Sequence, residues 1–184
     1  MAGTRTSRRR SGFTLIELAV GMAILVIGVL GFSQSLVSAQ KLDVKNREMD
    51  RAAQAAREVM ERMRAESFPD VFRRFNTVTA DDPGGAGTAP GAGFSVAGLT
   101  ARAGDADGLP GEIIFPTLSA SPEAIHETVV NAQLGMPRDL NGDGVIDAAD
   151  HSTDYRVLPV IVRVSWRGVG GDGYYELQTM LADY

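Results

Sequence analysis

The stretch that decides the fold is residues 11–34, which read S-G-F-T-L-I-E-L-A-V-G-M-A-I-L-V-I-G-V-L-G-F-S-Q. No charged residue stands between Leu18 and Gln40, and the centre of this run is almost wholly aliphatic residues, Met and Gly. A helix needs about 20 apolar residues to cross the hydrocarbon layer of a bilayer. Residues 13–34 meet that length, so the sequence predicts one membrane-spanning helix in this region.

A basic leader, residues 1–12, precedes the apolar run and contains four arginines and no acidic residue. The positive-inside rule predicts a cytoplasmic amino end and a carboxyl-terminal part outside. A secretory signal peptide cleaved near residues 37–39, a plain anchor and a twin-arginine export signal all fit this pattern. None of the three explains Glu17, because a carboxylate costs roughly 2.5–3.5 kcal/mol at mid-membrane and less near the interface.

The string at residues 11–17, between a basic leader and a long apolar helix, resembles the prepilin signature of type IV pilins and type II secretion pseudopilins. The resemblance covers residues 8–40. It implies cleavage after Gly12 by a prepilin peptidase, N-methylation of Phe13 and retention of the apolar helix. It also implies a single-pass protein of the bacterial inner membrane, with a periplasmic head, that joins other pilin or pseudopilin subunits in a filament.

In this family Glu17 has a role that agrees with its chemistry. Cleavage creates an amine at Phe13, and the carboxylate of Glu17 can pair with such an amine on a neighbouring subunit. Both charges are costly in lipid when alone, and pairing offsets much of that cost. The resemblance therefore implies that Glu17 sets the register of assembly.

The sequence departs from many major pilins in the middle of the apolar helix. Where those proteins carry a proline, this chain has Gln34, with Gly28 and Gly31 nearby. Glycine costs about 1 kcal/mol relative to Ala in a helix, so these positions can loosen it. The segment is most similar to PilV-type minor pilins or minor pseudopilins.

The helical pattern continues past the apolar run without a stop signal. An apolar stripe at spacings of 3, 4 or 7 residues comprises Leu42, Met49, Ala52, Ala56, Val59 and Met63. Pro69 ends the pattern, which predicts one helix from about Thr14 to Ser67, about 80 Å long. Residues 13–40 are its transmembrane and filament-core half, and residues 41–68 its amphipathic half. A coiled-coil dimer fits the stripe, but the leader favours packing against the protein's own head.

Residues 69–184 are expected to form that head. It begins with a Gly-rich loop, residues 80–111, and carries short strand candidates at 94–99, 112–115 and 126–130. Alternating apolar residues predict a β-hairpin at 155–182 with its turn in 168–173, and Trp166 is expected in the core. The order of elements predicts a pilin-like α+β fold, in which the long helix packs on a small antiparallel sheet.

The second specific motif is the acidic loop, residues 139–150, which reads D-L-N-G-D-G-V-I-D-A-A-D. Oxygen-bearing side chains stand at loop positions 1, 3, 5, 9 and 12, with Gly at position 6 and Ile146 expected to point to the core. This is the spacing of an EF-hand calcium loop. The predicted Ca²⁺ ligands are the side chains of Asp139, Asn141, Asp143 and Asp150, the backbone carbonyl of Val145, and Asp147 directly or through water.

The acidic loop has Asp150 at position 12, where an EF-hand has Glu, and in this it is similar to the calcium loops of dockerin modules. The competing interpretation is an acidic turn with no metal. His126 and His151 do not form a recognisable transition-metal pair. The Ca²⁺ ion is predicted to be structural, fixing a loop beside the hairpin in a head without disulfides.

Composition removes several classes of function. The 184 residues include no cysteine, which excludes disulfides, thiolate zinc sites, iron–sulfur ligation and a cysteine nucleophile. The net charge of −5 gives no reason to infer nucleic-acid binding. No catalytic motif is found, so the protein is predicted not to be an enzyme. Two classes remain: a minor pilin or pseudopilin, and a membrane-anchored calcium-dependent binding or adhesion module outside any filament.

Overall fold

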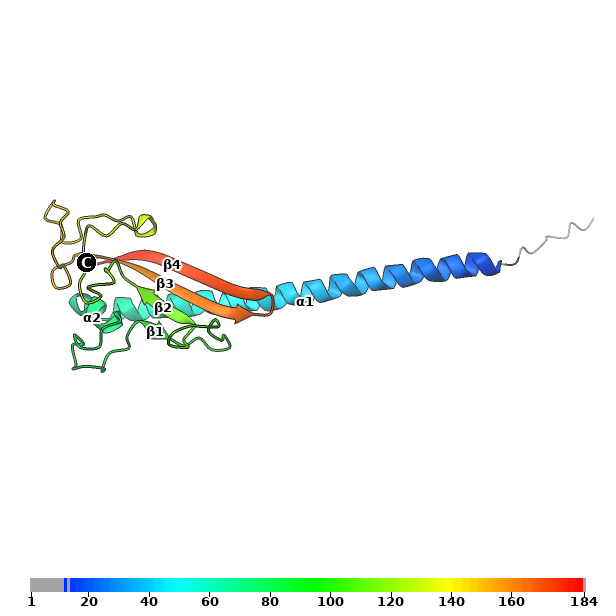
Figure 1. Ribbon diagram of the computed structural model, residues 1–184, viewed down its shortest axis with the longest axis horizontal. Coiled ribbons are helices and arrows are strands. Elements are labelled where there is room, and N and C mark those ends of the chain that lie inside the picture. The colour runs from blue at the N-terminus through cyan, green and yellow to red at the C-terminus, as the bar shows by residue number, and fades with distance from the viewer. Residues whose placement is uncertain (1–11, 13, 184) are drawn as a thin grey trace, which may run out of the picture. The chain divides into compact units, whose positions relative to one another are not determined.

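The computed structural model describes Gly12 and residues 14–183 (Figure 1). The leader residues 1–11 and the predicted methylation site Phe13 lie outside the described residues. The chain divides into two compact units, Met1–Asp43 and Val44–Tyr184, which are described separately.

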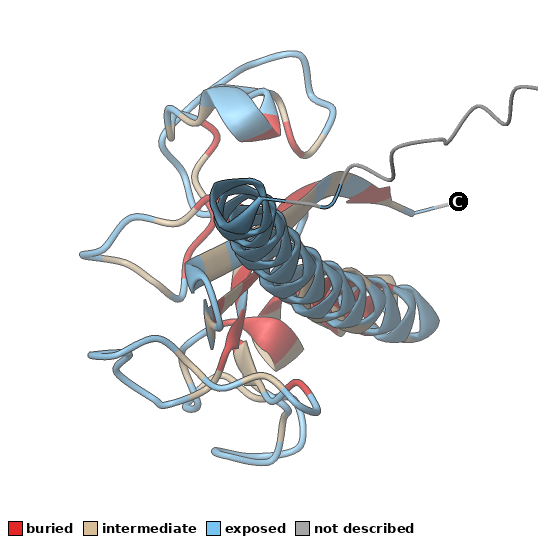
Figure 2. Ribbon diagram, turned by 90° about the vertical axis from the view of Figure 1, so that its right-hand side faces the viewer, coloured by how far each residue is buried: buried red, intermediate tan, exposed pale blue. Residues whose placement is uncertain are grey.

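The described part of the first unit is the beginning of helix α1, which runs from Leu15 to Ala65. The hydroxyl of Thr14 accepts a hydrogen bond from the backbone N–H of Glu17 at 3.3 Å, which caps the first turn. Gly28 and Gly31 do not interrupt the helix. Every described residue from Gly12 to Arg47 is exposed, as the pale blue helix in Figure 2 shows. By length and composition, α1 can cross a membrane.

The second unit contains the amphipathic half of α1. The predicted stripe is confirmed in this unit, because Ala52, Ala56, Val59 and Met63 are buried and Met49 packs partly against them. Two short helices follow α1: η1, a 3-10 helix at Phe68–Asp70, and α2 at Val71–Phe75. The prediction that α1 ends before Pro69 is confirmed to within two residues.

The sheet of the second unit has four antiparallel strands in the order β1-β2-β3-β4 (Figure 1). The strands are β1 at Gly93–Phe94, β2 at Gly111–Ile114, β3 at Val157–Gly168 and β4 at Gly171–Ala182. The third short helix, η2, is a 3-10 turn at Ala132–Leu134. The fold is therefore α+β, with one long helix and a small antiparallel sheet, as predicted.

The hydrophobic core lies between the sheet, α2 and the amphipathic half of α1 (Figure 2). Val160, Val162, Val164 and Trp166 project from β3 into this core, in the alternation that the sequence predicts. The indole N–H of Trp166 donates a 3.1 Å hydrogen bond to the carboxylate of Glu48 on α1. The polar atom of this buried ring is thus satisfied by the helix on which it packs.

Three details of the head differ from the predictions. The hairpin turn comprises only Val169 and Gly170, since pairing continues to Gly168 and Gly171. Of the strand candidate at 94–99, only Phe94 lies in a strand, as the second residue of β1. The candidate at 126–130 is wrong: these residues form no strand, and the side chain of Glu127 accepts hydrogen bonds from the acidic loop instead.

Candidate functional site

The acidic loop lies at the end of the sheet where β3 begins and β4 ends, opposite the hairpin turn (Figure 1). Leu140 is fully buried and anchors the loop to the core. Its carbonyl accepts hydrogen bonds from the backbone N–H groups of Arg156 at 2.8 Å and Val157 at 3.0 Å. The loop is therefore fixed to the first residues of β3.

The first half of the loop is a tight turn around the carboxylate of Asp139. This carboxylate accepts hydrogen bonds from the backbone N–H of Gly142 at 2.6 Å and of Gly144 at 2.8 Å. The bond from Gly144, followed by that from Gly142, lowers the pKa of Asp139. Both glycines have positive φ, +79° and +87°, which favours glycine at loop positions 4 and 6.

The next two predicted ligands belong to the same turn. The side-chain oxygen of Asn141 accepts from the N–H of Asp143 at 3.0 Å, and the carboxylate of Asp143 accepts from the N–H of Val145 at 2.7 Å. The amide nitrogen of Asn141 lies 3.3 Å from a carboxylate oxygen of Asp143 and 3.3 Å from one of Asp154. Asp154, which sequence analysis did not single out, therefore joins Asp139, Asn141 and Asp143 at this turn.

The second half of the loop contains the other two predicted side-chain ligands, Asp147 and Asp150. The carboxylate of Asp150 accepts from the backbone N–H groups of Ile125 at 3.2 Å and Ser152 at 2.9 Å. Ile146 is 49% exposed, so the expectation that it points to the core is wrong. Leu140, which is fully buried, is instead the residue of the loop that reaches the core.

Glu127 is the residue that sequence reasoning missed. Its side chain is only 1% exposed, and one carboxylate oxygen accepts from the N–H of Leu140 at 2.5 Å and of Asn141 at 3.3 Å. The other oxygen accepts from the N–H of Asp147 at 3.2 Å. A carboxylate beside apolar residues at 125–130 was the available signal, but residues 126–130 were predicted as a short strand.

His151 lies beside Glu127 and is buried as well. Its Nε2 atom is 3.2 Å from an oxygen of Asp147 and 3.8 Å from an oxygen of Glu127, and its Nδ1 atom is 3.1 Å from Asp154. Burial by itself disfavours the charged ring, but the hydrogen bonds to Asp147 and Asp154 outweigh it and raise the pKa of His151. The pKa of Asp147 is lowered by the N–H of Ala149 and by His151.

Glu127, Asp147 and His151 form a group that can hold a metal ion. Each offers one ligand atom, and the three atoms lie within 4.8 Å of one another. His126 lies outside the group, with its Nδ1 atom 3.1 Å from the carbonyl oxygen of Ala148. The group takes Asp147 from the acidic loop, whereas Glu127 and His151 come from outside it.

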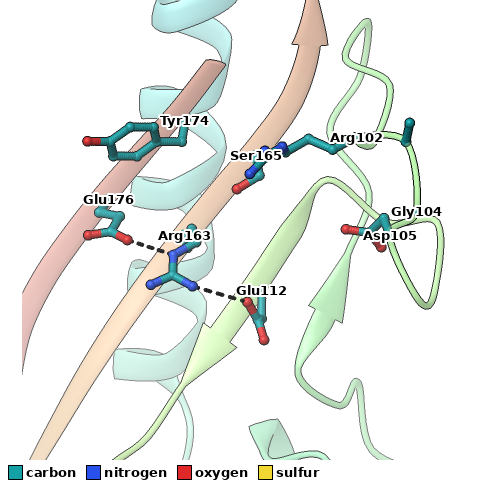
Figure 3. Close-up of a pocket in the computed structure, with 9 residues that line it drawn as sticks. Arg102, Gly104, Asp105, Glu112, Arg163, Ser165, Tyr174 and Glu176 are labelled. Atoms are coloured by element: carbon teal, nitrogen blue, oxygen red, sulfur yellow. Dashed lines mark hydrogen bonds and ion pairs between the residues drawn. The ribbon is translucent and has the colours of Figure 1, made fainter. Parts of the chain in front are cut away.

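A polar hollow of about 470 Å³ lies on the sheet face that carries Arg163, with a loop before β2 along one side (Figure 3). Arg163 at its centre pairs with Glu176 at 2.6 Å and with Glu112 at 3.7 Å. Tyr174 stands at the rim and is 67% exposed. Two carboxylates therefore flank the Arg163 guanidinium, and the ring of Tyr174 is open to solvent.

The predicted processing and assembly residues belong to the first unit. Gly12 is exposed, Phe13 lies outside the described residues, and Glu17 is exposed in the first turn of α1. The comparison with protein families bears on this segment. Residues 7–33 match the prokaryotic N-terminal methylation motif. That match supports a type IV pilin-like prepilin, which implies processing by a peptidase and assembly with other pilins.

The matched motif covers Gly12, Phe13 and Glu17 and ends inside the apolar half of α1. No curated protein and no solved structure matches the chain. The motif and the apolar helix together indicate membrane anchoring.

Proposed function

We propose that this protein is a minor pilin or pseudopilin, a structural subunit that assembles through α1 into a type IV pilus or a type II secretion pseudopilus. The observation that carries the proposal is the methylation motif at residues 7–33. It overlaps the first half of α1, whose described residues up to Arg47 are exposed and whose apolar run is long enough for lipid or for a filament core. The role is structural and involves no catalysis.

Processing and topology follow from the same motif. A prepilin peptidase cuts after Gly12 on the cytoplasmic side of the inner membrane, and the new amino terminus at Phe13 is N-methylated. The head, in the second unit, lies in the periplasm. Residues 13–40 then pass from the membrane into the core of the filament, where they contact other subunits.

The absence of Pro in the apolar half supports a minor rather than a major subunit. Gln34 lies within α1, which is continuous through Gly28 and Gly31 to Ala65. A PilV-type minor pilin or a minor pseudopilin, which primes or modifies a filament, is the subunit class that this segment favours.

Calcium binding by the acidic loop is the second part of the proposal. Asp139, Asn141 and Asp143 bring oxygen side chains to one tight turn, with the carbonyl of Val145 next in the chain. Asp147, directly or through water, and Asp150 complete the proposed set. Ca²⁺ takes six to eight hard oxygen ligands at 2.3–2.6 Å, which suits this donor chemistry. The ion would stabilise this end of the sheet in a head that contains no disulfide.

Co-expression of the full chain with a prepilin peptidase tests the first part. Mass spectrometry of the membrane fraction should show loss of residues 1–12 and a methylated Phe13. A Gly12→Val variant should stay uncut, while Gly21→Val in α1, where a Cβ meets nothing within 4 Å, should be processed normally. An uncut wild-type chain would refute the proposal.

Calorimetry on the full chain in detergent tests the calcium loop. Titration with Ca²⁺ should release heat at one site, and Asp143→Asn should weaken binding at least tenfold, because one charged ligand is lost. Absence of heat at millimolar Ca²⁺ would remove calcium from the proposal without affecting the filament role.

The polar hollow supports a second candidate, a membrane-anchored binding module outside any filament (Figure 3). The absence of cysteine makes the two candidates easy to separate. A single Leu25→Cys variant in α1 should, on oxidation of sheared filaments, form disulfide-linked pairs with a single-Cys neighbouring subunit. A chain found only as monomers in the membrane would favour the binding module.

A further inference from the structure

The environment of His151 has a feature that the proposed function does not use. Carboxylates face both nitrogens of this buried ring: Asp154 faces Nδ1 at 3.1 Å, and Asp147 faces Nε2 at 3.2 Å. Glu127, which is almost completely buried, approaches Nε2 to 3.8 Å. Among the described residues, no lysine or arginine forms an ion pair with Glu127.

A neutral imidazole cannot satisfy this arrangement. One of its nitrogens carries a lone pair, and that lone pair would face a carboxylate across a short distance with no cation between them. Either the ring carries two protons, or Nδ1 carries a proton and a metal ion binds Nε2. In metal sites, histidine commonly donates its second N–H to a carboxylate, and Asp154 is placed to accept that bond.

We propose that Glu127, Asp147 and His151 bind one divalent transition-metal ion, with Zn²⁺ as the best fit. Zinc binds His nitrogen and carboxylate oxygen at about 2.0–2.2 Å in tetrahedral geometry, which separates its ligand atoms by roughly 3.3–3.6 Å. The observed separations from Nε2, 3.2 Å to Asp147 and 3.8 Å to Glu127, lie on either side of that range. Asp154 orients the ring through Nδ1, and water takes the fourth position.

This site is chemically distinct from the proposed calcium turn. An imidazole nitrogen is a ligand for zinc and similar metals, whereas Ca²⁺ selects oxygen. Only Asp147 belongs to both donor sets. In the proposed calcium site it stands at loop position 9, where a water molecule can lie between the side chain and the ion. The proposal therefore does not rest on calcium binding or on the filament role.

The metal would join two segments of the head, one that carries Glu127 and one that carries Asp147 and His151. The carboxylate of Glu127 also accepts a hydrogen bond from the backbone N–H of Leu140, and Asp147 lies in the second half of the acidic loop. The backbone N–H of His151 donates a 2.9 Å hydrogen bond to the carbonyl of Ile125. A single ion would then stabilise the end of the sheet in the way that a disulfide does in other small secreted domains.

Zinc titration of the full chain tests the proposal, with protein purified in detergent without a polyhistidine tag and stripped with a chelator. One Zn²⁺ per chain should bind, and Co²⁺ in its place should give the visible absorption of a tetrahedral nitrogen–oxygen site. His151→Asn and Asp147→Asn should each weaken zinc binding at least tenfold. The Asn of the second variant can still accept the N–H of Ala149, which protects the fold. Asp143→Asn, in the calcium turn, is the matched control and should leave zinc binding unchanged.

Nitrogen-15 NMR of His151 gives a readout that does not depend on a variant. Zinc binding should shift Nε2 to the position of a metal-bound nitrogen and leave Nδ1 protonated. Zinc affinity equal in the wild type and in His151→Asn would overturn the proposal. So would two protonated ring nitrogens at neutral pH with Zn²⁺ in excess, because His151 would then be a buried imidazolium.

Discussion

Tyr155 connects the segment after α1 to the segment before β3. Its hydroxyl donates a 2.6 Å hydrogen bond to the carbonyl of Phe68 and accepts one of 3.3 Å from the N–H of Phe72. The two rings of Phe68 and Tyr155 pack edge to face with centroids 5.0 Å apart. Burial raises the pKa of Tyr155 to about 12, and the nearby charge of Asp70 adds to this effect.

That pKa predicts loss of stability in alkali. In the unfolded chain a tyrosine ionises near pH 10, so between pH 10 and 12 the unfolded state binds fewer protons than the folded state. The stabilisation is complete below pH 10 and is lost as the pH rises to 12, by up to about 3 kcal/mol. Urea unfolding at pH 8, 10 and 11.5 measures this loss. Tyr155→Phe has no ionisable group there and should show a smaller alkaline loss.

Glu127 gives the second prediction for a single residue. Glu127→Ala leaves the backbone N–H groups of Leu140, Asn141 and Asp147 without their acceptor. A buried unsatisfied donor costs about 1–3 kcal/mol, so the variant should lose at least 2 kcal/mol of unfolding free energy. Glu127→Gln keeps one acceptor oxygen and should lose less. Equal losses in denaturant unfolding of the two variants would contradict the hydrogen-bonding role.

Site residues that lie outside the acidic-loop motif explain why sequence analysis found only part of the site. The oxygen side chains of the acidic loop could be found because their spacing is local. Glu127 and Asp154 reach the loop only through the tertiary fold, and no spacing within residues 139–150 indicates them. The strand candidate at 126–130 was also wrong, because the side chain of Glu127 bonds to the acidic loop and the preference of a short segment for a strand is weak.

Helices and strands were predicted well wherever a regular repeat of apolar residues extended over many residues. The stripe on α1 and the alternation in β3 and β4 each continue over many residues, so packing on a single face is strongly specified. The region of 80–111 contains nine glycines and three prolines and has no such period. Its structure depends on individual turns, and only the short strand β1 forms within it before β2 begins.

In the β3–β4 hairpin, the indole ring of Trp166 lies very close to the backbone of Gly173. Gly173 pairs with Trp166, and a Cβ at Gly173 would lie 2.6 Å from two atoms of the indole ring. Gly173→Ala should therefore destabilise the head by about 1–3 kcal/mol, since Trp166 is held in the core and cannot move freely. Thermal unfolding followed by tryptophan fluorescence measures the loss.

Gly170 provides the matched control for that variant. It lies in the turn of the same hairpin, a Cβ there meets nothing within 4 Å, and its φ is not positive. Gly170→Ala should change the unfolding temperature by much less than Gly173→Ala. Similar losses at both positions would show that the cost comes from the backbone rather than from contact with Trp166.

For the whole molecule, the two units carry separable functions, and a variant of Glu17 should reveal this. Glu17 belongs to the first unit, whereas the hydrophobic core of the head belongs to the second, so Glu17→Ala should leave the head folded and cleavage after Gly12 intact. The proposed pairing of its carboxylate with the amine of a neighbouring Phe13 would be lost, and with it the register of assembly. We expect processed Glu17→Ala chains to accumulate in the membrane, with at least a tenfold lower share in sheared filaments. Glu17→Asp, which keeps the charge on a shorter side chain, should recover part of that share. Normal incorporation of the processed Glu17→Ala chain would show that the carboxylate does not set the register.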